Sequence, residues 1–176
     1  VVGEWRTGDG PWGASLFMTP FVLIGLLLLG GTVYQFLAIF NPRPTLIVSA
    51  TSAPLGGGFD LQWRFSGNTR SVRRLKIALK GREEARYRRG TSTHTDRREF
   101  AALAAAEARH PAEIRAGRAR VSIPGDTMHS FDAPDNKIVW TLNVEGEIPG
   151  WPDVSEEFPF TVRPVADSPF EGSRFK

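Results

Sequence analysis

The feature that most restricts the fold of this chain is an apolar run near its N-terminus. Residues 17–40 have the sequence FMTPFVLIGLLLLGGTVYQFLAIF and contain no charged side chain. As a helix rising about 1.5 Å per residue, the run is roughly 36 Å long and exceeds the hydrocarbon core of a bilayer, which is about 30 Å thick. A long helix inside a soluble domain normally retains a polar face. We therefore predict one transmembrane helix over residues 16–40, after an N-terminal tail over residues 1–15.

A cleaved signal peptide is the main alternative for such a run. Signal peptides have a basic leading region, a shorter apolar core and a cleavage site with small residues. Here the preceding tail contains Glu4, Arg6 and Asp9, and the run is followed by the stiff sequence NPRP at positions 41–44. We therefore expect the segment to be retained as a membrane anchor.

The predicted helix also contains candidates for contact with neighbouring helices. Gly25, Gly30 and Gly31 leave a shallow groove, and Gln35 places one amide near the end of the run. Small residues and amides favour close helix packing in membranes, although the spacing is not G-x-x-x-G and glycine is common in such helices. Packing against another helix and simple exposure to lipid both stay open.

The charges on the two sides of the run predict an orientation. The N-terminal tail has one arginine and two acids, whereas the other side has Arg43 and a basic stretch that starts at Arg64. Because basic residues favour the cytoplasmic side, we expect a single-pass membrane protein whose C-terminal domain is cytoplasmic.

Residues 41–165 have the pattern of an antiparallel β domain. Short apolar runs alternate with Gly, Pro, Asn and Asp, and between Phe59 and Phe65 large apolar residues alternate with polar ones. Such alternation gives a strand one apolar face. We predict a mainly β fold, an antiparallel β-sandwich of immunoglobulin-like kind, followed by a C-terminal tail over residues 166–176. The expected strands cover residues 45–49, 59–65, 72–79, 118–123, 137–144 and 158–162.

Two segments of this domain need a separate prediction. Residues 83–97 are strongly polar and are expected to form the tip of a protruding hairpin. Residues 100–108, FAALAAAEA, are rich in alanine, which favours helix by intrinsic propensity. Because the neighbouring segments all have strand patterns, we expect residues 100–108 to be extended.

Basic and acidic residues are separated along the chain. Residues 64–98 contain twelve Lys or Arg against three acids, and residues 126–171 contain ten acids against two bases. Such halves fold against each other as solvated faces, or they present surfaces to an acidic subunit or to anionic headgroups. Nucleic acid is not expected, because Tyr87 is the only aromatic residue interleaved with the basic ones. The candidate contacts are Arg73, Arg74, Arg82, Arg86, Arg88 and Arg89.

A further candidate contact is Trp151, which lies between Pro149 and Pro152 in a rigid loop. A rigid aromatic tip can anchor an interface. The alternative is an indole that folds back on the edge of the sandwich, and both stay open.

Residue types for catalysis or metal binding are sparse. The chain has no cysteine. The histidines are not spaced along the sequence as metal ligands usually are, and they are His94, His110 and His129. A metal site formed in space by His94, Asp96 and His129 is the remaining arrangement. The adjacent acids Glu83 and Glu84 point to opposite faces of a strand, which disfavours an acid–base pair. We therefore predict no catalytic residue, no metal and no cofactor.

The second half of the domain resembles a known family. Residues 123–124 (IP), residues 129–131 (HSF), the strand KIVWTLNV and the closing segment GEIPGWPDVSEEFPFTVRP are similar to the C-terminal half of an arrestin-like β-sandwich, mainly over residues 118–164. The charged stretch from Arg82 to His94 also resembles a hairpin of bacterial single-pass membrane proteins with such a domain. The resemblance implies a module for binding or scaffolding proteins. Arrestins have two such domains and a buried charge network, and neither maps onto this chain.

Together these patterns favour an accessory or adaptor subunit that is anchored in a membrane and is not an enzyme. The expected partners are the bilayer and other membrane subunits, as in a respiratory, photosynthetic or transport complex. The alternative is a membrane-anchored ligand-binding sensor or enzyme, with a site in the β-sandwich loops where His94, Asp96, Glu83 or His129 converge.

Overall fold

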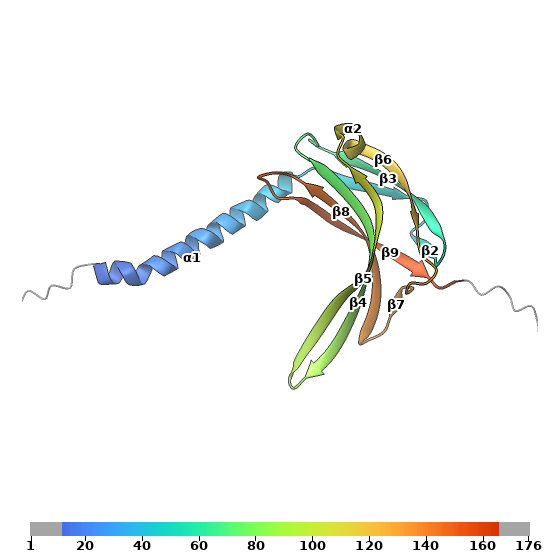
Figure 1. Ribbon diagram of the computed structural model, residues 1–176. Helices are drawn as coiled ribbons and strands as arrows, with labels where there is room; N and C mark the ends of the chain where they lie inside the picture. The colour runs from blue at the N-terminus through green and yellow to red at the C-terminus, as the bar shows by residue number, and fades with distance from the viewer. Residues whose placement is uncertain (1–11, 166–176) are drawn as a thin grey trace, which may run out of the picture. The chain divides into compact units, whose positions relative to one another are not determined.

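The structure is a computed structural model that describes residues 12–165, with side chains described from residue 16 onward. The predicted tails over residues 1–15 and 166–176 fall largely outside this range. The chain divides into two compact units after Phe40, an apolar helix and a β domain. Figure 1 shows the course of both.

The first unit is helix α1 (Trp12–Leu37), which continues as the short 3-10 helix η1 (Ala38–Phe40). Within the described residues, the one segment long and apolar enough to cross a membrane is Leu16–Phe40, with 25 residues and a mean hydropathy of 2.2. Its apolar side chains are exposed, and Leu27 is 76 % accessible. Because the helix begins at Trp12, Pro20 lies in its interior, where it removes a backbone hydrogen bond.

The second unit consists of two packed sheets. The smaller sheet is antiparallel and has the strand order β1 (Arg43–Val48), β3 (Gly58–Ser66), β6 (Ala116–Ser122). The larger sheet has the order β2 (Ser52–Pro54), β9 (Val154–Arg163), β8 (Asn136–Glu147), β4 (Arg74–Arg89), β5 (Ser92–Ala108), with β7 (Phe131–Asp132) paired to β8. All of these pairs are antiparallel except β2 with β9, which is parallel. The mainly β, sandwich-type fold predicted from the sequence is therefore confirmed.

The core lies between the two sheets and follows the predicted alternation. Leu61 from β3 and Val144 from β8 are fully buried. The sheets are joined by stacking of Phe59 on Phe160, whose ring centroids are 4.3 Å apart. The buried indole of Trp140 donates a hydrogen bond to Met128 O at 3.0 Å, which satisfies its polar edge.

The alanine-rich segment is extended, as predicted, because it forms the second half of β5 against β4. Intrinsic helix propensity has a smaller effect on the conformation of this segment than its pairing with a neighbouring strand. Phe100 packs edge-on against Trp140 at 5.4 Å, and two register shifts interrupt the β4–β5 pairing, one of them next to Gly81. Three short elements were not predicted, namely β2, β7 and helix α2 (Pro111–Arg115), which begins at a proline in its first turn.

The β4–β5 hairpin is the feature that positions the site. Its two strands pair from Leu75 with Ala108 to Arg89 with Ser92 and turn at Gly90, whose φ of 65° favours glycine. Strand β8 supports β4 only as far as Ala85, opposite Asn136. Beyond that point the hairpin projects past the other strands, as the lower part of Figure 1 shows. The predicted hairpin tip is therefore present.

We predict that Gly117→Ala destabilises the domain. A Cβ at position 117 would clash with Cζ2 of Trp63, whose ring is fixed by a hydrogen bond from its Nε1 to Glu113 O. Such overpacking costs about 1–3 kcal/mol. Chemical unfolding of the detergent-solubilised chain, followed by tryptophan fluorescence, measures the loss. Gly125→Ala is the control, because its Cβ would meet nothing closer than 3.8 Å. Equal stability of both variants would contradict the packing.

Candidate functional site

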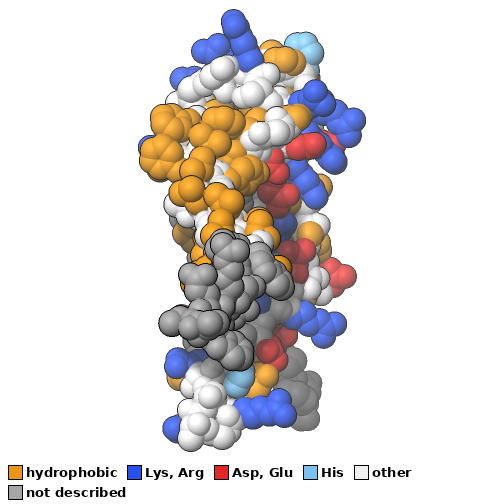
Figure 2. Space-filling view, turned by 90° about the vertical axis from the view of Figure 1, so that its left-hand side faces the viewer, with side chains coloured by type: hydrophobic (Ala, Val, Ile, Leu, Met, Phe, Trp, Pro, Cys, Tyr) orange, Lys and Arg blue, Asp and Glu red, His pale blue; other side chains and the backbone are white. Residues whose placement is uncertain are grey.

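The first candidate surface is the distal part of the β4–β5 hairpin. Arg86 and Arg88 lie on one face of the hairpin, opposite Thr95 and Thr93, and Arg89 lies on the other. All three arginines are exposed, and no ion pair joins them to any described residue. Figure 2 shows Lys and Arg side chains and a histidine gathered at this end of the domain. The tip therefore presents uncompensated positive charge.

The hairpin tip is stiffened by side-chain contacts between its two strands. The rings of Tyr87 and His94 stack with centroids 5.8 Å apart. The negative charge of Asp96, together with a hydrogen bond to it, raises the pKa of the Tyr87 phenol above its ordinary value. His94 and Asp96 are thus engaged with Tyr87.

Two of the arginines predicted as contacts form ion pairs within the domain. Arg74 Nε lies 3.1 Å from Glu107 Oε1, and this hydrogen bond is the main reason that the pKa of Glu107 is lowered. Arg82 Nε lies 3.0 Å from Glu84, and Arg82 Nη1 lies 3.4 Å from Glu157. The six arginines predicted as contacts therefore fall into two groups, because Arg74 and Arg82 are paired whereas Arg73, Arg86, Arg88 and Arg89 have no ion pair among the described residues.

The basic and acidic halves of the chain meet on the outer face of the larger sheet. Lys80 Nζ on β4 lies 2.8 Å from Glu145 Oε1 on β8. The hydrogen bond between these groups is the main cause that raises the pKa of Lys80 and lowers the pKa of Glu145. Beside the pair, the buried Asn143 donates to Glu157 Oε1 at 3.1 Å and accepts from Thr141 at 2.8 Å. For these strands the two halves fold against each other, which is one of the arrangements that the charge pattern left open.

The second candidate surface surrounds Asn41, the residue directly after Phe40. The Asn41 amide accepts a hydrogen bond from Trp151 Nε1 at 2.9 Å and donates two, to Pro152 O at 2.9 Å and to Asp153 O at 3.1 Å. We call this set the Asn41 clamp. Trp151 is half-buried, so its ring folds back on the domain edge while part of it stays accessible. Sequence reasoning missed Asn41, because its partners are 110 residues away.

The candidate helix-packing residues present an open surface. A Cβ added at Gly25, Gly30 or Gly31 would meet nothing within 4 Å. Gln35 is exposed and lies one turn after Gly31 on the same face, whereas Gly25 is roughly 120° away around the helix. These residues therefore do not form a single stripe.

The groups of the alternative site are not brought together as a metal centre. Within residues 16–165, no cluster of three or more His, Asp or Glu side chains could hold a metal ion. Glu83 pairs across the hairpin with Arg98, and His129 is an exposed residue of the loop before β7. The absence of catalytic, metal and cofactor sites stays a prediction.

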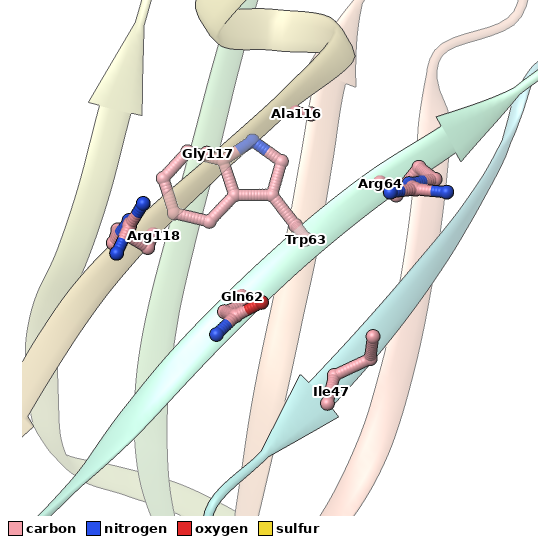
Figure 3. Close-up of a pocket in the computed structure, with 7 residues that line it drawn as sticks. All are labelled: Ile47, Gln62, Trp63, Arg64, Ala116, Gly117 and Arg118. Atoms are coloured by element: carbon pink, nitrogen blue, oxygen red, sulfur yellow. The ribbon is translucent and has the colours of Figure 1, made fainter.

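A shallow depression of about 480 Å³ lies on the smaller sheet. Figure 3 shows Gln62, Arg64 and Arg118 around it, on strands β3 and β6. Gln62 lies opposite Arg118 in the β3–β6 register. The depression is open, its lining is mixed, with Ile47 and Trp63 beside the polar side chains, and none of the histidines lines it.

Comparisons with known proteins show no family for this chain. No protein-family model and no curated protein matches the chain. The structure is similar to the crystal structure of Spo0M, a sporulation control protein from Bacillus subtilis, with a TM-score of 0.48 and 11 % sequence identity. The match covers 69 % of this chain and 49 % of that one, so the matched region spans about half the length of Spo0M.

The Lys80–Glu145 pair predicts a pH dependence of stability. Because the pKa of Glu145 is lowered, its contribution to the free energy of unfolding is present above the ordinary carboxyl pKa of about 4.3. This contribution is lost as the pH falls through the pKa of the folded state. Because the pKa of Lys80 is raised, its contribution to the free energy of unfolding is present below the ordinary lysine pKa of about 10.4. This contribution is lost as the pH rises through the pKa of the folded state. Glu145→Gln should remove roughly 0.5–1 kcal/mol near pH 7, because both groups are partly exposed.

Thermal unfolding between pH 3 and 11 measures this effect. In Glu145→Gln, stability should vary less with pH on both the acid and the alkaline side. Glu156→Gln on β9 is the control, because no ion pair involves Glu156 among the described residues. Identical pH profiles for Glu145→Gln and the unchanged chain would contradict the role of the pair.

Proposed function

We propose that this chain is a membrane-anchored accessory or adaptor subunit of a larger membrane protein complex. In this proposal α1 crosses the bilayer once and contacts neighbouring helices, and the β domain lies in the cytoplasm. The domain binds an acidic surface of a partner subunit through the hairpin tip. The partner complex is of the respiratory, photosynthetic or transport kind.

The unpaired arginines of the hairpin tip are the observation that supports this proposal most directly. Fourteen residues of β4 separate Arg74 from Arg88, which corresponds to roughly 46 Å of extended strand. Arg74 pairs with Glu147, next to the loop that holds the Asn41 clamp. The tip is therefore at the far end of the domain from the point where the helix joins it. The part of the hairpin that projects beyond Ala85 is not covered by β8, and such a tip suits contact with another protein.

The chemistry of the tip favours a carboxylate-rich partner. Guanidinium groups bind carboxylates through two parallel hydrogen bonds. Arg86 and Arg88 are two residues apart on one face, about 6.6 Å along the strand, and Arg89 faces the opposite way. The two faces can thus engage acidic residues on both sides of the arm. The stacking of Tyr87 on His94 limits the conformational freedom that binding would remove.

Co-purification tests this function. The tagged chain is purified from its native membrane in mild detergent, and the recovered subunits are identified by mass spectrometry. The triple variant Arg86→Gln, Arg88→Gln, Arg89→Gln should lose a specific acidic subunit by at least about tenfold, because interfacial charge pairs are costly to break. A matched control, Arg64→Gln, Arg115→Gln, Arg118→Gln, removes the same charge from the smaller sheet and helix α2, and it should retain the acidic subunit.

Other outcomes would contradict the proposal. Recovery of the chain as a lone monomer would argue against a subunit role. Loss of the partner in both triple variants would indicate an effect of net charge and not of the hairpin. A small molecule retained by the chain in place of a protein would favour the alternative, a membrane-anchored ligand-binding sensor or enzyme.

A further inference from the structure

The Asn41 clamp joins the loop around Trp151 to the residue that directly follows the apolar segment. Asn41 is bonded to Phe40, the last residue of the apolar segment, so their Cα atoms are about 3.8 Å apart. The 25-residue segment is roughly 37 Å long as a helix, which exceeds a hydrocarbon core of about 30 Å. Phe40 therefore emerges in the headgroup layer, which is about 5–7 Å thick on each side.

The indole of Trp151 is held in the same layer by this connection. Its Nε1 lies 2.9 Å from Oδ1 of Asn41, one residue beyond the apolar segment. The position follows from covalent continuity and one hydrogen bond, whatever the tilt of the domain. Tryptophan favours the headgroup zone because its ring is apolar and its N–H is polar. The loop is stiffened by Pro149 and Pro152, and Gly150 between them adopts a φ of 71°, which favours glycine.

Three arginines lie on segments that neighbour the clamp, Arg43 at the start of β1 and Arg70 and Arg73 in the turn before β4. Arg43 is two residues after Asn41, and its carbonyl oxygen accepts a hydrogen bond from Ser66 Oγ at 3.2 Å. The turn that follows Ser66 leads to Arg70 and Arg73, and Arg73 N donates to Glu147 O at 2.9 Å.

Arg43, Arg70 and Arg73 are all exposed, and none has an ion pair within residues 16–165. The opposing acids are Glu147 and Asp153, and Asp153 Oδ1 already accepts a hydrogen bond from Ile148 N. We call Arg43, Arg70, Arg73 and Trp151 the exit surface.

We propose that the exit surface docks the β domain onto anionic lipid headgroups, with Trp151 in the headgroup layer and the three arginines on lipid phosphates. The inference rests on the proposed membrane anchor. Guanidinium groups form bidentate hydrogen bonds with phosphate, and a basic side chain near an anionic leaflet strengthens association about fivefold. The exit surface is thus distinct from the hairpin tip, which lies at the other end of β4 and is assigned to a protein partner.

Depth measurement in lipid nanodiscs tests the docking. Because the chain has no cysteine, single cysteines can carry spin labels without other changes. Labels are placed at Ser71, between the two exposed arginines of the turn, at Thr91 in the hairpin turn, and at Leu27 within the helix. Accessibility to oxygen and to a water-soluble nickel chelate is compared in phosphatidylglycerol and phosphatidylcholine nanodiscs.

We expect Ser71→Cys to be shielded from the nickel chelate in phosphatidylglycerol and less so in phosphatidylcholine, while Thr91→Cys stays accessible in both. Adding Arg70→Gln and Arg73→Gln should weaken the docking about fivefold per arginine. Raising the salt to about 1 M should also expose the label, since the screening length falls to about 3 Å. Arg88→Gln with Arg89→Gln is the matched control at the tip and should leave the Ser71 label shielded.

The outcomes separate this inference from the proposed anchor. If the Leu27 label is accessible to oxygen and not to nickel, the helix spans the bilayer. A Ser71 label that is then equally accessible in both lipids, and insensitive to Arg70→Gln with Arg73→Gln, overturns the docking alone. A Leu27 label that is accessible to nickel overturns the anchor and the docking together.

Discussion

The constraint on which the rest of the structure depends is the exposed apolar surface of α1. Each exposed leucine costs about 1.5–3 kcal/mol in water relative to burial, and large side chains along Leu16–Phe40 are exposed in the described structure. Backbone groups give no such difficulty, because a helix satisfies its own hydrogen bonds. Lipid or neighbouring helices would remove this cost, and the segment is long and apolar enough to cross a membrane. The β domain buries its own apolar residues in a core between its two sheets.

The junction between the helix and the domain is short. Strand β1 begins at Arg43, three residues after η1 ends, and the amide of Asn41 is satisfied by three hydrogen bonds to the loop around Trp151. A Gly- or Ser-rich linker would behave as a flexible coil, whereas two prolines and the clamp restrict this segment. Within the domain, the Asn41 clamp lies near the Arg74 end of β4, and the β4–β5 hairpin presents unpaired charge at the other end.

The arginines show how far sequence reasoning reaches at a surface. The basic stretch was evident from composition, and the hairpin was predicted from its polar residues. Which arginines are free was not predictable, because Arg74 and Arg82 find their partners on other strands, Glu107 on β5 and Glu157 on β9. Asn41 and Trp151 illustrate the same difficulty, since their hydrogen bond joins residues 110 positions apart.

The sequence by itself determined the apolar helix, the sandwich and the main strands, because hydrophobic periodicity is a local property that the backbone geometry turns directly into buried faces. It also predicted the extended form of the alanine-rich segment, from its neighbours. Tertiary structure alone decided the order of strands, the bulges, the short elements β2, β7 and α2, and the division of arginines into paired and free. Those features depend on contacts between distant residues, which pairing and packing select and which no local pattern records.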